Sequence, residues 1–192
     1  MSLIAITGGI GSGKSVVAKI LLAMGYPVYD CDSKAKSIMD CSEEIKTFIS
    51  EKICSDAIRN DSSIDRTVLA EAVFGSPEKL ASLNSIVHEA VRCDLSRWSA
   101  SKDTAFVETA ILYQSGLDRM VDCVWEVVAP KEIRIERVIA RSNLTARQVE
   151  DRIKSQDSYV IENSHPATMF IDNDGFIPVL PRVLELLGYL GK

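Results

Sequence analysis

The sequence predicts an α/β protein in which a parallel five-stranded sheet is flanked by helices. Three observations lead to this prediction. Short apolar runs alternate with helical segments along most of the chain, which is typical of parallel sheets. The first apolar run is followed directly by a glycine-rich loop and then by a helix. With 192 residues, 46% of them hydrophobic, the chain is long enough to bury one core and carry a small insertion.

The glycine-rich loop is the segment GGIGSGKS at residues 8–15, which matches the pattern G-x-x-x-x-G-K-[ST]. A polyphosphate needs backbone N–H donors packed more closely than side chains allow, and glycines let the backbone turn toward it. Lys14 would reach the β and γ phosphates, and the Ser15 hydroxyl would bind Mg²⁺. The following helix would direct its positive N-terminal end at the same anion. The motif predicts a P-loop NTP-hydrolase-type fold that binds a nucleoside triphosphate.

The other elements follow in the order that this fold needs. Residues 3–7 predict the first strand, and residues 16–24 predict a helix that stops at Gly25 and Pro27. Further strands are predicted at residues 26–29, 104–108, 123–129 and 169–172. Residues from about 33 to 101 are predicted to be largely helical, with a breaker at 60–63 and a helix start at 75–77. Later helices are predicted at about residues 131–141, 145–157 and 178–187.

Composition excludes several classes of function. A net charge of −5 argues against a nucleic acid partner, since phosphate backbones are met by basic surfaces. No apolar run is long enough to span a membrane, and the chain opens into a strand rather than a signal peptide. Five scattered cysteines form no C-x-x-C pair, which is poor material for a zinc site or a disulfide framework. We therefore expect a cytoplasmic protein.

Carboxylates follow two of the predicted strands. Asp30 and Asp32 would share one direction if the strand continued through them, because strand side chains alternate. Beside a bound phosphate, a carboxylate is suited to take a proton from an attacking hydroxyl or to contact Mg²⁺ through water. The alternative is that Asp32 only caps the helix beginning at Ser33. Glu108 closes the third long strand, where it is either a second acid of the site or a solvated end residue.

Arginines dominate the predicted helix pair near the C-terminus. Arg134, Arg137 and Arg141 fall on one stripe of a helix, and a separate apolar stripe is available to pack on the sheet. Three guanidinium groups in line suit a clamp that closes on the γ phosphate as charge develops. The alternative is a solvated helix face paired with neighbouring glutamates. A turn at residues 142–145 would join this helix to the next. The pair, over about residues 137–157, resembles the lid of small-molecule kinases.

Asn173, Asp174 and Gly175 follow the last strand and form a turn motif. Next to a nucleotide site, the Asn173 side chain and the backbone amides of this turn could read an adenine edge. His88 and His165 show no spacing that marks either as catalytic, so a structural role is favoured for both on spacing alone.

Taken together, the motifs resemble the dephospho-coenzyme A kinase family. The resemblance rests on TGGIGSGKS at 7–15, VYDCD at 28–32, IDR at 64–66 with residues 69–74, LNSIVH at 83–88, Arg137 to Arg141 with Arg152 and Gln156, and FIDNDG at 170–175. The loop alone specifies a superfamily, whereas this combination in this order is specific and covers most of the chain.

The chain departs from the family pattern at several positions. Lys36 stands where the family usually has arginine, which keeps the charge but loses the bidentate fork. Glu89 stands where the family has the proline of a His-Pro pair. Gln114 stands where the family has the acid of its Pro-Leu-Leu-x-Glu segment.

The resemblance implies that the chain is an ATP-dependent kinase. It would phosphorylate the 3′-hydroxyl of the ribose of dephospho-coenzyme A, giving coenzyme A and ADP with Mg²⁺ as cofactor. The implied catalytic residues are Asp32 as the base, with Lys14 and Arg141 neutralising the transferring phosphoryl group. The implied ATP-binding residues are Gly9, Ile10, Gly11, Ser12, Gly13, Lys14, Ser15, Val16, Arg137, Arg141 and Asn173. The implied acceptor-binding residues are Thr7, Asp32, Lys36, His88 and Glu108. A helical insertion over about residues 60–101 would bind the acceptor.

Three other functions compete with this one. A small P-loop kinase with a different acceptor alcohol is the nearest, because acceptor identity depends on the insertion. A nucleotide-dependent switch usually carries D-x-x-G and N-K-x-D segments, and neither occurs in the sequence. An ATPase linked to nucleic acid is disfavoured by the acidic charge.

Overall fold

The computed structural model describes residues 2–142, 145–162 and 164–190, and the side chains of these except 155–162. Two residues of the expected turn at 142–145 therefore lie outside the described part, as does the side chain of Gln156. The chain divides into two compact units. We call Met1–Asp30 with Ser101–Lys192 the sheet unit, and Cys31–Ala100 the helical unit.

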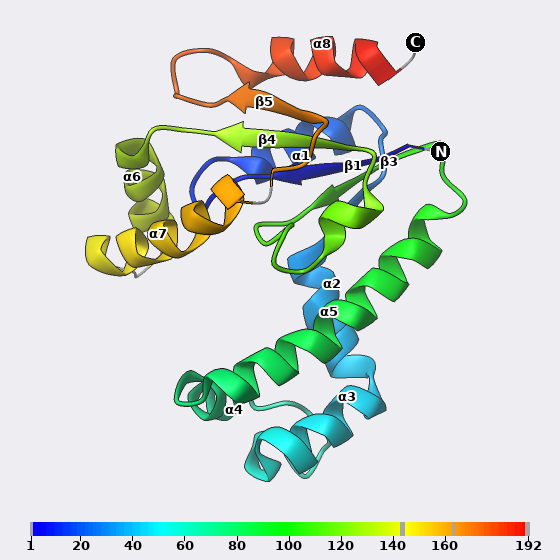
Figure 1. Ribbon diagram of the computed structural model, residues 1–192, viewed down its shortest axis with the longest axis vertical. Helices are drawn as coiled ribbons and strands as arrows, with labels where there is room; N and C mark the ends of the chain where they lie inside the picture. The colour runs from blue at the N-terminus through cyan, green and yellow to red at the C-terminus, as the bar shows by residue number, and fades with distance from the viewer. Residues whose placement is uncertain (1, 143–144, 163, 191–192) are drawn as a thin grey trace. The chain divides into compact units, whose positions relative to one another are not determined.

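The sheet unit is built on five parallel strands in the order β2-β3-β1-β4-β5 (Figure 1). The strands are β1 (Ser2–Thr7), β2 (Val28–Asp30), β3 (Thr104–Glu108), β4 (Cys123–Val128) and β5 (Thr168–Asp172). The predicted parallel five-stranded sheet is confirmed, and β1 lies at its centre because its apolar residues are buried on both faces.

The helices of the sheet unit are α1 (Lys14–Ala23), α6 (Lys131–Arg141), α7 (Ala146–Glu162) and α8 (Val179–Leu190), with a short helix η3 (Leu117–Met120). Figure 1 shows α8 running along the β5 edge of the sheet, and α1 packs on β1 and β3. One core cluster joins α1 and α8 to the sheet face that carries Ile4, Ile6, Phe106 and Trp125. Alternate residues of the same strands, including Thr7, therefore face the other side of the sheet.

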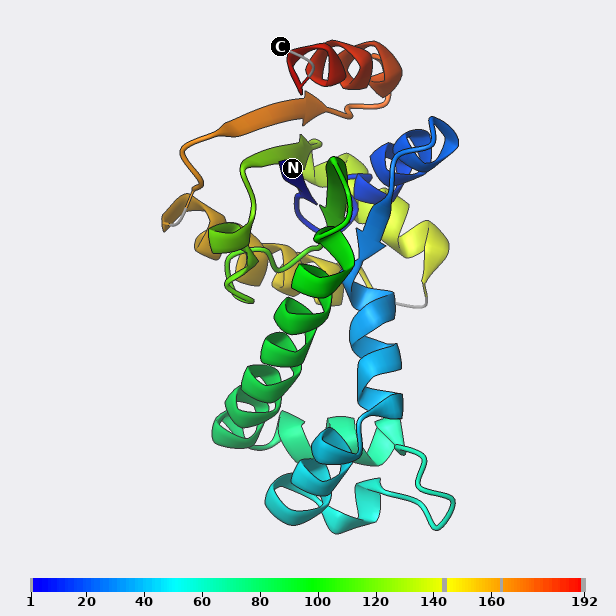
Figure 2. The same ribbon diagram turned by 90° about the vertical axis from the view of Figure 1, so that its right-hand side faces the viewer.

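The helical unit contains α2 (Cys31–Cys41), α3 (Glu43–Phe48), η1 (Ile49–Ile53), η2 (Ser55–Ala57), α4 (Arg66–Phe74) and α5 (Pro77–Ser99). In both views α2 lies beside α5, and the two helices pack on each other (Figure 2). The predicted helix start at 75–77 is present, with Pro77 as first residue and the Ser76 hydroxyl accepting the Lys79 amide at 3.3 Å. This unit begins at Cys31, because α2 and α3 belong to it, and it contains most of the expected insertion at about residues 60–101.

Candidate active site: the P-loop of the sheet unit

The glycine-rich loop connects the carboxyl end of β1 to the first residue of α1, Lys14. The Lys14 ammonium group lies over the loop, donating to the Gly8 carbonyl at 2.8 Å and the Gly9 carbonyl at 3.2 Å. Ser15 follows in the first turn of α1 and is exposed. The helix N-terminus and the Lys14 ammonium group therefore lie together at the loop, an arrangement suited to an anion.

Asn173, which follows β5, is hydrogen-bonded to this loop. Its Nδ2 donates to the Ser12 carbonyl at 2.8 Å, and its Oδ1 accepts from Arg137 Nη2 at 3.3 Å. The approach is so close that a β-carbon at Gly13 would overlap the Asn173 amide, and Gly13 also has a left-handed φ of 100°. Only glycine fits both demands, so the loop and the turn after β5 form one structure.

Arg137 connects the helix α6 to the same glycine-rich loop. Its Nη1 lies 3.5 Å from the Gly11 carbonyl and 3.4 Å from the Ser12 carbonyl. Arg141 ends α6 one turn further on and is exposed. The structure thus brings together three regions of the chain that the sequence analysis assigned to ATP: the loop, the arginine helix and Asn173.

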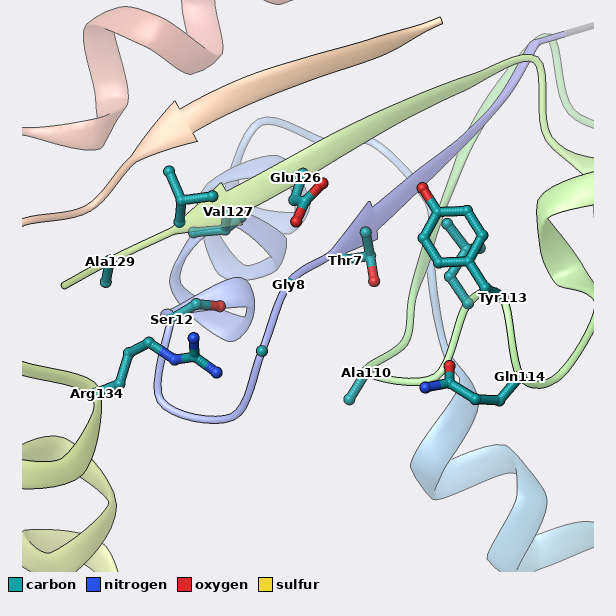
Figure 3. A pocket seen from close by; sticks show the side chains of 13 residues that line it. Thr7, Gly8, Ser12, Ala110, Tyr113, Gln114, Glu126, Val127, Ala129 and Arg134 are labelled. Carbon is teal, nitrogen blue, oxygen red and sulfur yellow. The ribbon is translucent and has the colours of Figure 1, made fainter. Parts of the chain in front are cut away.

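A cavity of about 310 Å³ opens beside the loop, within the range of ligand sites. Figure 3 shows Ser12 and Arg134 on its loop side, and Ala110, Tyr113 and Gln114 opposite. Thr7 and Glu126 line the cavity from neighbouring strands, where they are register partners. The Ser12 hydroxyl is buried and has no hydrogen-bond partner among the described residues, so it is available to a bound group.

The strand-end acids fall on two faces of the sheet. Glu108 pairs in register with Ile6 on one side and Asp30 on the other, and Ile6 belongs to the core beneath α1 and α8. Register partners in a parallel sheet project to the same face, so Asp30 and Glu108 form a carboxylate pair on that face. Thr7, which follows Ile6, projects to the opposite face. The candidate acceptor residues Thr7 and Glu108 are therefore close along the sheet edge but differ in direction.

Asp32 differs from the expectation that it continues the strand. The strand β2 ends at Asp30 and α2 begins at Cys31, so Asp32 is an exposed residue of the first helical turn. It is also not the residue that caps this helix, because the helix has already begun. An acid in a first turn interacts favourably with the helix dipole.

Lys36 and His88 also lie in the helical unit. Lys36 is exposed on α2, where its backbone carbonyl accepts Arg66 Nη2 at 3.3 Å. His88 is half-buried on α5, and burial, with a smaller contribution from the Arg92 charge, lowers its pKa. Glu89 is ion-paired with Arg92 on the same helix.

Arg134 is not among the site residues that the family resemblance implies. The sequence placed it on the arginine stripe, but the structure buries it against the loop, with 9% of its surface exposed and its Nε 3.0 Å from the Ile10 carbonyl. The signal lay in the loop itself. The motif requires glycine only at its first and sixth positions, whereas this loop also has Gly9 and Gly11, which leave room for a close neighbour.

Comparison with known proteins decides the family. The family model for dephospho-CoA kinase matches residues 2–178. A dephospho-CoA kinase from Bacteroides fragilis strain YCH46 is 37% identical over 190 residues, covering 97% of this chain and 92% of that protein. Another from Porphyromonas gingivalis is 42% identical over 159 residues, covering 82% of this chain and 78% of its own length.

The chain belongs to the dephospho-CoA kinase family. Members of this family are ATP-using kinases, so the chain is an enzyme, as the motifs predicted.

Solved structures agree with this assignment. TT1252 from Thermus thermophilus superposes with a TM-score of 0.82 at 32% identity, covering 98% of this chain and 96% of that one. A dephospho-CoA kinase from Campylobacter jejuni gives a TM-score of 0.71 at 22% identity, with 98% and 96% covered, which supports the fold. Deoxyadenosine kinase from M. mycoides shares the fold more distantly, with a TM-score of 0.55 at 14% identity, covering 99% of this chain and 100% of that one. The predicted P-loop fold is confirmed.

Proposed function

We propose that this member of the dephospho-CoA kinase family transfers the γ-phosphoryl group of ATP to the 3′-hydroxyl of the dephospho-CoA ribose, giving CoA and ADP. The observation that carries the proposal is the joined donor site: the P-loop, Arg137 and Asn173 are hydrogen-bonded to one another in a chain whose sequence matches this family. Phosphoryl transfer is catalysed mainly by positioning and charge neutralisation, which such a site provides.

On the donor side, the loop amides and Lys14 would hold the phosphates. The Lys14 ammonium group now contacts two loop carbonyls, and it would turn to the β and γ phosphates when ATP binds. Arg137 and Arg141 would neutralise charge on the transferring group from α6. Asn173 and the backbone of its turn would read the adenine edge. The ATP-binding set is completed by residues 9–16.

The residues present fit a magnesium ion carried by ATP. The described residues contain no group of three or more metal-binding side chains, so no all-protein metal cage exists among them. Mg²⁺ in kinases needs few protein ligands, since phosphates and water supply the others. The exposed hydroxyl of Ser15 at the start of α1 would be that ligand. Held there, the ion would supply neutralisation of the negative charge on the phosphates.

On the acceptor side, we assign the base to Asp32, which would take the 3′-hydroxyl proton as that oxygen attacks the γ phosphorus. Its place beyond the carboxyl end of β2, where ligands bind in such folds, supports this role. Lys36 and His88 of the helical unit would contact dephospho-CoA, with Thr7 and Glu108 at the strand ends. The helical unit would thus be the acceptor-binding part.

The helices α6 and α7 would form a lid, covering about residues 137–157 as the sequence analysis expects. They share a small apolar cluster made by Val138, Val149 and Ile153, which would hold α7 against α6 beside the site. Closure would exclude water, which otherwise competes with the ribose hydroxyl for the phosphoryl group.

The surroundings that we propose are the cytoplasm, with small-molecule partners only. All five cysteines are free, which suits a reducing compartment. Among the described residues, no helix is both long and apolar enough to cross a bilayer. The net charge of −5 disfavours a nucleic acid partner.

The test is an assay of ADP and CoA formation from ATP and Mg²⁺, with and without dephospho-CoA. We expect ADP to form only when dephospho-CoA is present, with CoA appearing in equal amount. Adenosine and AMP serve as control acceptors.

Two outcomes would contradict the proposal. ADP formation independent of any acceptor would indicate an ATPase or a nucleotide switch. Stimulation by adenosine or AMP but not by dephospho-CoA would keep the kinase chemistry and overturn the substrate.

A further inference from the structure

Arg134 is a buried charged side chain in the first turns of α6. Only 9% of its surface is exposed, which is unusual for arginine. A buried guanidinium needs hydrogen-bond acceptors, and Arg134 Nε donates to the Ile10 carbonyl at 3.0 Å. Figure 3 shows the guanidinium directed at the P-loop beside Ser12. The loop therefore supplies an acceptor for this arginine, and the arginine occupies the loop carbonyl.

The loop is shaped to receive this residue. A β-carbon at Gly9 would overlap the Arg134 guanidinium, and one at Gly11 would overlap the backbone of Arg134 itself. The helix α6 thus lies directly on the loop at the Arg134 turn, with no side chain between them. Both glycines stand at motif positions where phosphate binding alone allows other residues.

Ile10 contacts the helices through both its backbone and its side chain. Its carbonyl accepts the Arg134 hydrogen bond, while its side chain packs against the cluster of Val138, Val149 and Ile153 that joins α6 to α7. Arg137 lies one turn beyond Arg134 and contacts the Gly11 and Ser12 carbonyls. The arginines of α6 therefore contact the carbonyls of three consecutive loop residues, Ile10, Gly11 and Ser12.

We propose that Arg134 is a positioning residue for the donor site, which holds the P-loop in its phosphate-binding shape and sets Arg137 against it. It acts through the hydrogen bond from Nε to the Ile10 carbonyl. Its positive charge does not contribute to ATP binding by acting directly on the phosphates. The inference rests on the proposed function, because it takes the loop to be the ATP site.

Three substitutions separate a positioning role from a charge role, because their side chains place different atoms where Arg134 has Nε. Glutamine carries its amide nitrogen the same number of bonds from Cα as arginine Nε, so Arg134→Gln keeps the donor and loses the charge. Arg134→Met keeps the length and loses both. Arg134→Lys keeps the charge but has a methylene at that position.

The experiment titrates each variant with ATP and Mg²⁺ by calorimetry without acceptor, then measures KM for ATP and kcat at saturating dephospho-CoA. We expect Arg134→Gln to stay within about threefold of wild type in ATP affinity. Arg134→Met and Arg134→Lys should weaken ATP binding and raise KM for ATP about tenfold, the effect of losing one hydrogen bond from a charged donor. The turnover at saturating ATP should change less than KM in each case.

Lys19→Met is the matched control. It removes a positive charge from an exposed position on α1, outside the helices that we assign to the lid. It should leave ATP affinity unchanged. Melting temperatures show whether each variant is folded, and if Arg134→Met is not, the contrast between the glutamine and lysine variants decides the question.

Wild-type affinity in Arg134→Lys with weak binding in Arg134→Gln would overturn the proposal in favour of a charge acting on phosphate. Equal behaviour of all three variants, whether unaffected or impaired, would also overturn it. Failure of the wild-type protein to bind ATP would instead contradict the proposed function of the loop.

Discussion

The sheet unit and the helical unit hold their candidate residues in different ways. In the sheet unit, strand register and backbone contacts place the site: the Ser12 carbonyl accepts Asn173, and Thr7 is set opposite Glu126. In the helical unit, Asp32 and Lys36 are exposed side chains of one helix, α2. A donor that is always ATP suits a rigid backbone site, and recognition of a particular acceptor is left to exchangeable side chains.

The two units also differ in the side chains that they bury. The sheet unit buries large aromatic side chains such as Phe106 and Trp125 between its sheet and helices. The helical unit buries aliphatic side chains such as Ile45, Ile49 and Leu95, and its surface ion pairs contribute little in water. We therefore expect substitutions in the sheet unit to alter ATP chemistry, and those in the helical unit to alter acceptor use or local stability.

The largest effect is expected for Lys14→Ala in the sheet unit. Loss of a charge positioned at the reacting phosphates should reduce kcat by at least about 10²–10³. The change is measured as ADP formation at saturating substrates. Lys19→Ala, an exposed lysine on the same helix, is the control and should keep full activity. Substantial turnover by Lys14→Ala would show that the loop is not the donor site.

The second largest effect is expected for Asp32→Asn. This variant tests whether the helical unit contributes to the chemical step as well as to binding. Removing a general base should lower kcat by at least ~10² without weakening ATP binding. Asp30→Asn makes the same change two residues earlier and should have a much smaller effect. Wild-type turnover by a folded, ATP-binding Asp32→Asn variant would show that Asp32 is not the general base.

Lys36 offers a finer test of acceptor recognition. Lys36→Met should raise KM for dephospho-CoA about tenfold, the loss expected for one charge-assisted hydrogen bond, with KM for ATP unchanged. Lys36→Arg restores the residue usual in the family and should equal or improve on wild type, because arginine can bind bidentately. Lys52→Met, an exposed lysine of the same unit, controls for net charge. If Lys36→Met raised KM for ATP instead, the assignment of Lys36 to acceptor binding would be wrong.

The smallest effect is expected for Ser76→Ala, which removes the cap of α5. The helical unit should lose about 1 kcal/mol of stability, seen as a melting temperature lower by a few degrees. Both KM values should stay as in wild type. Ser76→Asn keeps a capping side chain and should melt close to wild type. A change in ATP affinity would mean that the cap matters beyond its own unit.

The fold could be predicted because its signals are local. The strand, loop and helix around residues 3–24, and the strand at 104–108, follow from short apolar runs and glycines. Strand order and register could not be predicted, since these depend on contacts between distant residues. The opposite directions of Thr7 and Glu108 are a product of register alone.

The site could be predicted only where a sequence pattern is compatible with a single structural role, as it is for the glycine-rich loop. Hydrogen bonds join the loop, Arg137 and Asn173, and the assignment of all three to ATP stays a prediction. Asp30 and Asp32 would share one direction only if the strand continued, and it does not, because a helix starts between them at Cys31. The burial of Arg134 was missed because an arginine stripe has the same spacing whether it faces water or a glycine loop.

The strand order has a consequence for how this enzyme can change. The strands β2 and β3 are neighbours in the sheet, and the whole helical unit is the connection between them. Parallel neighbours always need a crossover, and this one contributes nothing to the pairing of β1 with β4 or of β4 with β5. We therefore expect the sheet to tolerate changes in the length of residues 31–100, or their exchange for another helical segment, provided that the two flanking strands still meet. If this unit binds the acceptor as proposed, such an exchange would alter the acceptor and keep the phosphate donor.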